Sequence, residues 1–381
     1  MNARAAARWR AGHPWIYRSD IVAAPAVGPG AALVLDERGA TLGTALWSPA
    51  SLISLRLLTP EARRPDDAFF VERLSRAAAY RQRLAPDATA YREVHAEADG
   101  LPSLVVDRYG DYLVVQILSA GLEALREPLV EALDQVFSAR GILVRNDVPV
   151  RRREQLPQAT ELLSGEVPDR LEVREGPVRF IADPWSGQKT GAFLDQRENR
   201  ARAASLAHGR ALDCFAYHGS FALHLALGAG EVIAVDSSAR ALERARENAA
   251  LNGFANLRTR EANVFDLLRE EERAVEQYDV IVLDPPAFAK TRRTVARALR
   301  GYKEINLRAL RLLAPGGHLL TFSCSYHVSD ALFREMLQAA AADAGRPIRL
   351  IEWRGQAPDH PVLLQVPETG YLKGAVLQAV G

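Results

Sequence analysis

The chain has 381 residues, of which 25% are charged and 48% hydrophobic. This composition excludes a mostly disordered protein, and the length suggests two or three domains. Lys and Arg total 48 against 47 Asp and Glu, so the net charge is +1. Because the molecule has no overall basic field, local patches would have to bind any nucleic-acid partner. Only four of the cations are Lys; the excess of Arg suits RNA binding but equally fits a bias in genome composition.

Two cysteines, Cys214 and Cys324, exclude a disulfide scaffold and a zinc site built from cysteines. The N-terminal segment MNARAAARWRAGHPW lacks the apolar core of a signal peptide. No uninterrupted apolar stretch approaches the roughly 18 residues that a membrane span needs. We therefore expect a soluble, cytoplasmic, multidomain protein with no membrane association and no metal site.

The first half of the chain predicts short strands mixed with helices. Residues 1 to about 70 contain apolar runs separated by Gly, Pro and Asp, which is typical of strands joined by turns. Beyond residue 67, Phe70, Leu74 and Ala78 share one helical face. In chain order we expect a helix over 67–84, strands within 91–117, a helix over 121–137, a strand over 141–147, a polar loop over 150–158 and a hairpin over 171–183.

From about Lys189 onward, strands and helices alternate. The expected strands are apolar runs over 211–215, 231–236, 257–262, 279–284 and 317–324. This alternation predicts a parallel, doubly wound sheet, so the fold class is α/β. We expect domains at 1–70, 71–180 and 181–381, with the last boundary near Gly176–Asp183; the middle domain is small and α+β.

A cofactor crevice is expected where the parallel strands end, because open α/β sheets bind ligands there. Asp213 to Gly219 close the first strand and open a helix, and Gly219 would let the backbone approach a ligand. Asp236 ends the second strand, where a carboxylate can accept ribose hydroxyls, and Asn263 follows the third, where an amide can read an adenine edge. Taken singly, Gly219 is equally consistent with a helix-start glycine, and Asp236 with the N-cap of the next helix.

The cofactor that fits this layout best is S-adenosylmethionine. A nicotinamide dinucleotide requires three glycines, G-x-G-x-x-G, around its pyrophosphate. This loop has Gly219 and no second glycine, and S-adenosylmethionine has no pyrophosphate. Oxidoreduction with a nicotinamide cofactor is the alternative that the missing glycines disfavour.

The fourth and fifth strands end in residues that suit chemistry on a pyrimidine. Asp284-Pro285-Pro286 form a rigid turn, which holds the Asp284 carboxyl and Phe288 at the sheet edge. In a 1-4-5 strand order, Cys324 lies next to Asp284. A thiolate that adds to C6 makes C5 nucleophilic, and Phe288 could stack on a flipped base. A lone Cys is more often a buried hydrophobe, which is how we interpret Cys214.

Several motifs together resemble the bacterial large-subunit ribosomal RNA cytosine-C5 methyltransferases of the RlmI type. They are QKTGAFLDQREN, LDCFAYHGSFALHLA, LDPPAFAK, YKEINLRAL, SCSYHV and ETGYLK. GHPWIYRSDI resembles the start of that family's PUA domain, a small β-barrel that binds RNA. The resemblance covers nearly the whole chain. It implies an N-terminal PUA-like domain and a C-terminal Rossmann-like class I methyltransferase domain.

The resemblance also implies roles for individual residues. Cys324 would attack C6 of a cytosine in 23S rRNA, and Asp284 would contact the N3 edge. The residues implied to bind S-adenosylmethionine are Gln196, Arg197, Asp213, Phe215, Gly219, Asp236, Ser237 and Asn263. Other RNA cytosine-C5 methyltransferases carry a second Cys beside the Pro of the fourth-strand motif, whereas this chain has Asp284-Pro285-Pro286-Ala287. The group that removes the C5 proton is therefore open. A homodimer is a further expectation of the family.

Two basic segments are candidates for RNA binding. Eight cations lie between Lys290 and Arg311, directly after the Asp284 turn, and we single out Lys290, Arg292 and Arg293 as phosphate contacts. Near the N-terminus, cations mix with aromatic residues, and there we single out Trp15 and Arg18. A solvated helix face is the alternative for the first segment.

Two further functions remain open at this point. One is methylation of a guanine at N2 or N7 in the same rRNA, since related enzymes use an Asn/Asp-Pro-Pro turn without a thiol. The other is a non-catalytic factor that binds 23S rRNA or a precursor of the large subunit during assembly.

Overall fold

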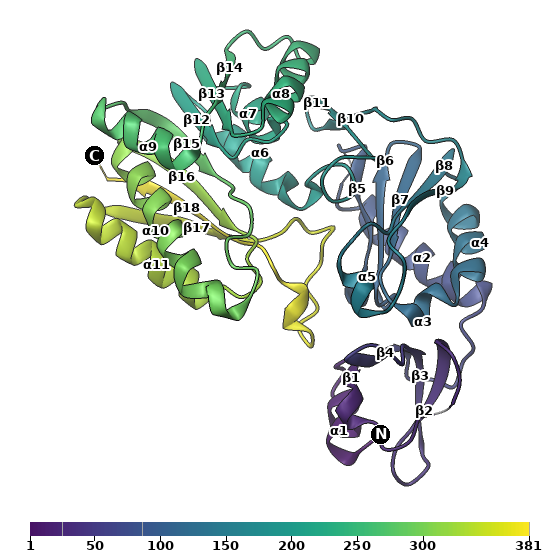
Figure 1. The fold of residues 1–381 in the computed structure, drawn as a ribbon. Coiled ribbons are helices and arrows are strands. Elements are labelled where there is room, and N and C mark those ends of the chain that lie inside the picture. Colours follow the sequence, from purple (N-terminus) through teal and green to yellow (C-terminus); the bar gives the residue numbers. More distant parts are fainter. Residues whose placement is uncertain (25, 86, 381) are drawn as a thin grey trace. The chain divides into compact units, whose positions relative to one another are not determined.

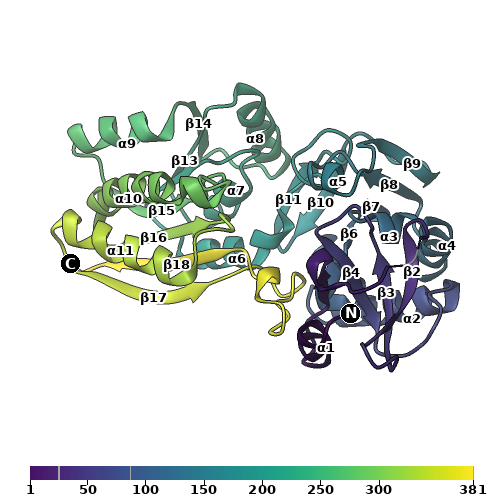
Figure 2. The ribbon, with the colours of Figure 1, turned by 60° about the horizontal axis from the view of Figure 1, so that its bottom comes forward.

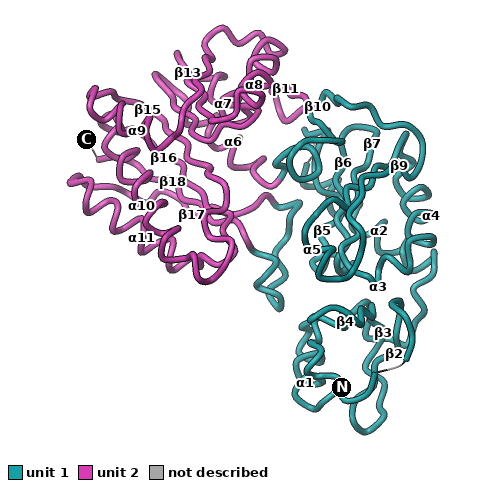
Figure 3. The backbone as a smooth tube through the Cα atoms, viewed as in Figure 1, with its two compact units in different colours: residues 1–173, 182–194, 358–370 teal, residues 174–181, 195–357, 371–381 magenta. Residues whose placement is uncertain are grey.

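The computed structural model describes residues 1–24, 26–85 and 87–380. The chain folds into two compact units, which Figure 3 colours separately. The first comprises residues 1–173, 182–194 and 358–370, and the second comprises residues 174–181, 195–357 and 371–381. Neither unit is one continuous segment. The division into three successive domains stays a prediction.

The first unit begins with a helix and a four-stranded antiparallel sheet (Figure 1). The sheet has the order β1-β4-β3-β2, with β1 (Trp15–Tyr17), β2 (Gly30–Leu35), β3 (Thr41–Trp47) and β4 (Ile53–Thr59). Helix α1 (Ala3–Arg10) is capped by Asn2, whose side chain accepts a hydrogen bond from Ala5 N at 2.8 Å. The apolar pattern does not predict α1, because its buried face is largely Ala rather than large apolar residues.

The same unit contains a five-stranded sheet in the order β5-β6-β7-β8-β9. Its core is shared with α2 (Asp67–Gln82) and α4 (Arg126–Phe137). The helix expected over 121–137 is interrupted after α3 (Ala120–Glu123), because Pro128 belongs in the first turn of a new helix rather than inside a longer one. The expected loop over 150–158 begins with α5 (Val150–Arg153). The strands are β5 (Ala90–His95), β6 (Leu104–Tyr109), β7 (Tyr112–Ile117), β8 (Gly141–Arg145) and β9 (Thr160–Gly165), the last an edge strand with no buried residues.

The second unit is built on a seven-stranded sheet in the order β14-β13-β12-β15-β16-β18-β17. The strands are β12 (Arg210–Cys214), β13 (Glu231–Asp236), β14 (Leu257–Glu261), β15 (Tyr278–Leu283), β16 (Leu313–Ser323), β17 (Ile348–Arg354) and β18 (Lys373–Ala379). The first five are parallel, which confirms the doubly wound, Rossmann-like sheet and the 1-4-5 order. Strand β18 is antiparallel to both of its neighbours, and the alternation pattern does not predict it.

Helices cover both faces of this sheet. One face packs against α9 (Val264–Arg273), α10 (Val295–Leu312) and α11 (Asp330–Ala344), with α10 and α11 side by side in Figure 2. The other packs against α6 (Arg197–Leu206) and α7 (Ser220–Leu225), and α8 (Ala239–Leu251) follows β13. A hairpin of β10 (Leu171–Glu175) and β11 (Val178–Ala182) turns at Gly176, as predicted. In the described part of the chain, every helix is too short or too polar to span a bilayer.

Candidate active site

The loop after β12 has an unusual backbone. Phe215, Tyr217 and Gly219 have φ values of 64°, 50° and 84°, in the left-handed region. A Cβ on Gly219 would lie 2.9 Å from the Cβ of Ala245 on α8. Glycine is therefore required here both by φ and by packing against α8. The expected approach of a ligand to the backbone at Gly219 stays a prediction. Gly219 also caps α7, as the alternative interpretation has it.

Asp236 is held by backbone amides at the end of β13. Its Oδ2 accepts a hydrogen bond from Tyr217 N and its Oδ1 accepts one from Ser238 N, both at 2.9 Å. Ser238, rather than Asp236, caps α8. Each carboxylate oxygen has a second lone pair, and the residue is half-buried, so Asp236 can still accept hydroxyl donors. The neighbouring Ser237 is exposed.

Asn263 follows β14 and caps α9. Its Oδ1 accepts a hydrogen bond from Phe265 N at 2.9 Å. This helix cap uses the amide oxygen and is not among the expectations from the sequence. Whether the side chain also contacts an adenine stays a prediction.

Asp213 is buried at the end of β12, and one of its oxygens is unsatisfied. Oδ2 accepts a hydrogen bond from Ala222 N at 2.9 Å, whereas Oδ1 has no hydrogen-bond partner among the described residues. Burial raises the pKa of Asp213 well above its ordinary value, and the charges of Asp284 and Asp236 raise the pKa further. Three carboxyls thus interact at one edge of the sheet, which favours a cationic ligand.

Asp284 lies directly after β15 and is bound by Gln196. The Nε2 of Gln196 donates a hydrogen bond to Oδ1 of Asp284 at 2.9 Å. Gln196 is itself buried, and its Oε1 accepts a hydrogen bond from Asn199 Nδ2 at 2.6 Å. The structure therefore places Gln196 against the carboxyl of the expected reaction centre. Arg197 is buried at the start of α6, where its Nε donates to Glu198 at 3.0 Å.

Cys324 lies directly after β16, at the strand end next to that of Asp284. In the parallel pair, Leu283 at the end of β15 is opposite Thr321, and β16 continues to Ser323, so the two strands end within two residues of each other. The half-buried Sγ of Cys324 is 3.9 Å from the carbonyl oxygen of Pro285. Cys214, by contrast, is fully buried in β12, and burial raises the pKa of its thiol well above the ordinary value. Cys214 is a core residue, as expected.

Three residues that sequence reasoning missed join the two strand ends. The Oγ of the buried Ser325 accepts a hydrogen bond from Ala289 N at 3.1 Å and lies 2.9 Å from the hydroxyl of Tyr302 on α10. The Nζ of Lys373 on β18 donates to Ser325 O at 2.9 Å. Ser325 thus ties the Cys324 loop to the loop that follows Asp284. The only sequence signals are their places in the SCSYHV, YKEINLRAL and ETGYLK motifs.

Phe288 belongs to an aromatic cluster beside these loops. Its ring centroid is 4.6 Å from that of Tyr302, 5.9 Å from that of Phe265 and 6.4 Å from that of Phe215. The half-buried ring is positioned by these neighbours. Stacking of Phe288 on a base stays a prediction.

The basic segment between Lys290 and Arg311 divides into two parts. At its C-terminal end, Lys303 pairs with Asp343 at 2.6 Å, Arg308 with Glu272 and Glu304, and Arg311 with Glu272 at 2.7 Å. These cations are paired with carboxylates, as in the solvated helix face that is the alternative interpretation of the segment. Lys290, Arg292 and Arg293 are exposed, and no carboxylate pairs with them in the described ranges.

The N-terminal cations and aromatic residues are also mostly occupied within their own unit. Trp9 is buried, and its Nε1 donates to Leu42 O at 2.9 Å, so Trp9 is a core residue rather than an RNA contact. The Nε1 of Trp15 donates to Glu97 Oε1 at 2.9 Å, and Arg18 donates to Ser51 O at 3.1 Å. Arg8 pairs with Asp20 at 2.6 Å.

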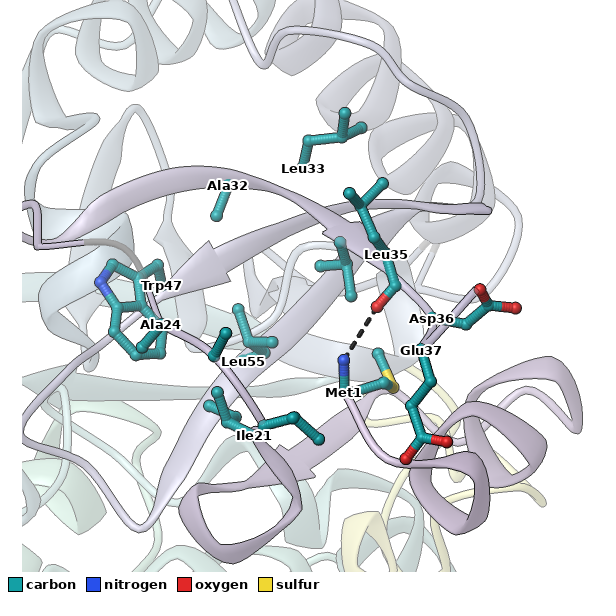
Figure 4. Close-up of a pocket in the computed structure, with 13 residues that line it drawn as sticks. Met1, Ile21, Ala24, Ala32, Leu33, Leu35, Asp36, Glu37, Trp47 and Leu55 are labelled. Atoms are coloured by element: carbon teal, nitrogen blue, oxygen red, sulfur yellow. Dashed lines mark hydrogen bonds between the residues drawn. The ribbon is translucent and has the colours of Figure 1, made fainter. Parts of the chain in front are cut away.

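The N-terminal sheet carries a mostly apolar pocket of about 400 Å³ (Figure 4). Leu33, Leu35 and Leu55 line it, and the N-terminal ammonium of Met1 donates to Leu35 O at 2.9 Å beside it. Trp15 and Arg18 are not among its lining residues.

Comparisons with protein families agree with this architecture. Residues 103–370 match the family model of S-adenosylmethionine-dependent methyltransferases, and residues 1–60 match that of PUA-like domains. Two relatives are named Ribosomal RNA large subunit methyltransferase I. The one from Tolumonas auensis is 44% identical over 380 residues, covering 97% of this chain and 96% of its own. The one from Shewanella amazonensis is 44% identical over 375 residues, covering 96% and 94%.

Solved structures share the fold over nearly the whole length. A methyltransferase in complex with SAH has a TM-score of 0.85 at 21% identity, with 99% of this chain and 98% of that chain covered. A SAM-dependent methyltransferase from Streptococcus mutans has a TM-score of 0.83 at 21% identity, with the same coverage.

These matches define the class of the protein. The chain belongs to the S-adenosylmethionine-dependent methyltransferases, with a PUA-like domain at its N-terminus. Within that class it belongs to the family whose members carry the name Ribosomal RNA large subunit methyltransferase I. Its cofactor is S-adenosylmethionine, as the missing glycines predict.

Proposed function

We propose that the protein methylates C5 of a cytosine in large-subunit ribosomal RNA, 23S rRNA, through a covalent bond between Cys324 and C6 of the base. The observation that carries this proposal is the pair of strand ends at β15 and β16. There a half-buried thiol and a carboxyl end neighbouring strands, with Cys324 Sγ 3.9 Å from Pro285 O. The names of the relatives support ribosomal RNA of the large subunit as the substrate.

The residues at the neighbouring strand ends fit S-adenosylmethionine. The cofactor supplies a methyl group on a positively charged sulfonium, and it also carries an amino group. The unsatisfied Oδ1 of Asp213, in a cluster of three interacting carboxyls, fits such a cation. Asp236 would accept the ribose hydroxyls, with Ser237 beside it and Asn263 at the adenine. Gln196, Arg197, Phe215 and Gly219 complete the proposed set.

The chain's own residues then act on the base. The Cys324 thiolate donates its electron pair to C6, and the C5–C6 π electrons are delocalised toward N3, where Asp284 contacts the base edge. Gln196 holds the Asp284 carboxyl in one orientation by its hydrogen bond to Oδ1. After C5 is methylated, C5 loses its proton and the C6–S bond breaks, which returns the thiolate.

RNA would be bound by exposed cations near this edge and by residues of the N-terminal domain. Lys290, Arg292 and Arg293 are exposed cations directly after the Asp284 loop, where a phosphate backbone would be neutralised. Phe288 would stack on the target base. Trp15 and Arg18 are the proposed contacts of the PUA-like domain, and a homodimer is the proposed assembly.

The test is methyl transfer from labelled S-adenosylmethionine to rRNA from a strain that lacks the enzyme, followed by identification of the methylated nucleoside by mass. The wild-type protein should yield 5-methylcytidine, and Cys324→Ala should yield none. A methylated guanosine, or an active Cys324→Ala variant, would refute the cytosine mechanism. RNA binding without any transfer would favour the assembly-factor alternative.

A further inference from the structure

Lys373 lies beside the loop that carries Cys324. Strand β18 pairs with β16 so that Lys373 is directly opposite Ser323, the residue before Cys324. The next residue, Gly374, is opposite Phe322, and a Cβ on Gly374 would collide with the Phe322 ring. Glycine therefore allows β18 to pair closely with β16 at the point where Lys373 enters the site.

The ammonium group of Lys373 is buried and hydrogen-bonded to backbone carbonyl oxygens. The residue is only 5% exposed, and its Nζ donates to two carbonyl oxygens, those of Ser325 at 2.9 Å and Tyr371 at 2.8 Å. In the described part of the chain, no carboxylate forms an ion pair with it. Burying a cation without a counter-ion costs free energy, so the presence of Lys373 at this position calls for an explanation.

Charged groups around Lys373 indicate which anion it faces. Burial lowers the pKa of Lys373, whereas the negative charges of Asp330 and of ionised Cys324 raise it. Asp330, at the start of α11, is exposed and accepts a hydrogen bond from Trp353 Nε1 at 3.3 Å. Asp284 directly follows the neighbouring strand. Tyr302 is uncharged at neutral pH, as tyrosine ordinarily is, and burial raises its pKa further. The acidic groups disfavour a thiolate, and Lys373 opposes them.

We propose that Lys373 is the counter-ion that stabilises the Cys324 thiolate and keeps the nucleophile ionised near neutral pH. This inference rests on the proposed function and deepens it. A free thiol has a pKa of about 8.5, and a nearby ammonium lowers that value. The thiol proton leaves to solvent, and the thiolate pairs with the ammonium until its electron pair forms the bond to C6. Lys373 acts through Cys324 and is therefore a positioning residue.

The test is the pH dependence of Cys324 alkylation by iodoacetamide in the full-length protein without RNA. Alkylation at Cys324 is read by peptide mapping, with the buried Cys214 as an internal reference. In Lys373→Met, the apparent pKa of Cys324 should rise by about one unit, so that alkylation at pH 7 slows about tenfold and recovers at high pH. Lys373→Arg should retain the wild-type profile, because it keeps the charge.

Lys303→Met is the matched control, because Lys303 on α10 is partly exposed and already pairs with a carboxylate, that of Asp343, at 2.6 Å. It should leave the profile unchanged. An unchanged Cys324 pKa in Lys373→Met, or a loss of rate that is equal at every pH, would overturn the proposal. If Lys373→Met fails to fold, the wild-type profile decides, since a Cys324 pKa at or above 8.5 contradicts a stabilised thiolate.

Failure of this inference is distinguishable from failure of the proposed function. Alkylation requires neither RNA nor methyl transfer, so it reports on the thiolate alone. An active Cys324→Ala variant would remove the cytosine mechanism and leave the alkylation result standing. An inactive Cys324→Ala variant with an unshifted thiol pKa in Lys373→Met would retain the mechanism and remove Lys373 from it.

Discussion

In the seven-stranded sheet, the polar side chains at the ends of β12, β13 and β14 are held differently from those at the ends of β15 and β16. On the side of β12, β13 and β14, backbone amides within twenty residues bind the key groups: Ala222 N binds Asp213, Tyr217 N binds Asp236 and Phe265 N binds Asn263. On the side of β15 and β16, side chains from distant segments do so. Gln196 binds Asp284 across 88 residues, and Lys373 binds Ser325 O across 48.

The positions of the polar side chains are therefore set by local sequence motifs on the first side and by the packing of the whole fold on the second. The proposed cofactor side is set by short loops, so substitutions there should act mainly on cofactor binding. The proposed reaction side is assembled from α6, α10 and β18, so substitutions far along the chain should act on the rate of transfer. The following changes test this distinction.

The largest effect is expected for Asp284→Asn. The amide keeps the shape of the side chain but cannot supply the carboxyl at the base edge, so kcat should fall by about 10²–10⁴-fold. Affinity for S-adenosylmethionine, measured by calorimetry, should change little. A large loss of cofactor affinity with normal kcat would assign Asp284 to cofactor binding and contradict its proposed role at the base.

Gln196→Leu should have the next largest effect, because it removes the hydrogen bond that orients Asp284. We expect kcat to fall by about 10–100-fold, as small misplacements of reacting groups do. Single-turnover transfer at saturating cofactor measures this. Ser205→Ala is the matched control, because Ser205 is exposed near the end of α6, the helix that begins directly after Gln196. Equal rates for Gln196→Leu and wild type would refute the orienting role.

Asp236→Asn should weaken S-adenosylmethionine binding about tenfold, because one charged acceptor of the proposed ribose contact is lost. The rate at saturating cofactor should remain. Ser238→Ala is the control: it removes the cap of α8 and should cost about 1 kcal/mol of stability without changing cofactor affinity. Unchanged cofactor affinity in Asp236→Asn, together with weakened cofactor binding in Ser238→Ala, would contradict a role for Asp236 in the cofactor site.

Asp213 should make the cofactor-free protein less stable as pH rises. Its pKa is raised in the folded state, so the folded protein retains a proton that the unfolded chain loses above about pH 4. The contribution of Asp213 to the free energy of unfolding is therefore fully present at low pH. As pH rises, it is lost at up to about 1.4 kcal/mol per pH unit until the pH exceeds the pKa of the folded state. The free energy of unfolding of wild type and of Asp213→Asn can be measured by denaturant unfolding at several pH values. As pH rises, the stability of Asp213→Asn should increase relative to that of wild type. A constant difference would contradict the raised pKa.

The smallest effect is expected for the exposed cations. Arg292→Ala with Arg293→Ala should weaken RNA binding several-fold and lower the salt slope by about two. Arg311→Ala, which removes a cation already paired with Glu272, should change the slope less. Equal salt slopes for both variants would indicate that the whole segment is a solvated helix face and that Arg292 and Arg293 do not contact RNA phosphates.

The comparison also explains which parts of the structure the sequence predicts. Alternating strands and helices predict the parallel sheet. The strand ends point to Asp213, Asp236, Asp284 and Cys324 as candidate site residues, because parallel strands end at one edge. The antiparallel β18 breaks that alternation, so nothing in the pattern brings Lys373 beside Ser323. Likewise, Gln196 reaches Asp284 only through the packing of α6 and its preceding turn.

Charge patterns along the chain are less informative than strand ends, because pairing is tertiary. The run from Lys290 to Arg311 is basic in sequence, yet Glu272 on α9 neutralises Arg308 and Arg311. Trp9 is grouped with surface cations in the sequence, but it fills the core under the N-terminal sheet. Which cations face solvent is decided by elements that pack from elsewhere.

The most direct test of the central claim is to trap the adduct. RNA that carries 5-fluorocytidine retains fluorine where the C5 proton must leave, so the enzyme stays bound through the C6–S bond once C5 is methylated. The account predicts a denaturation-resistant complex that requires S-adenosylmethionine, with the cross-linked peptide containing Cys324, and no complex with Cys324→Ala. A complex attached at another residue, or release of unmodified protein from RNA that has been methylated, would contradict the mechanism.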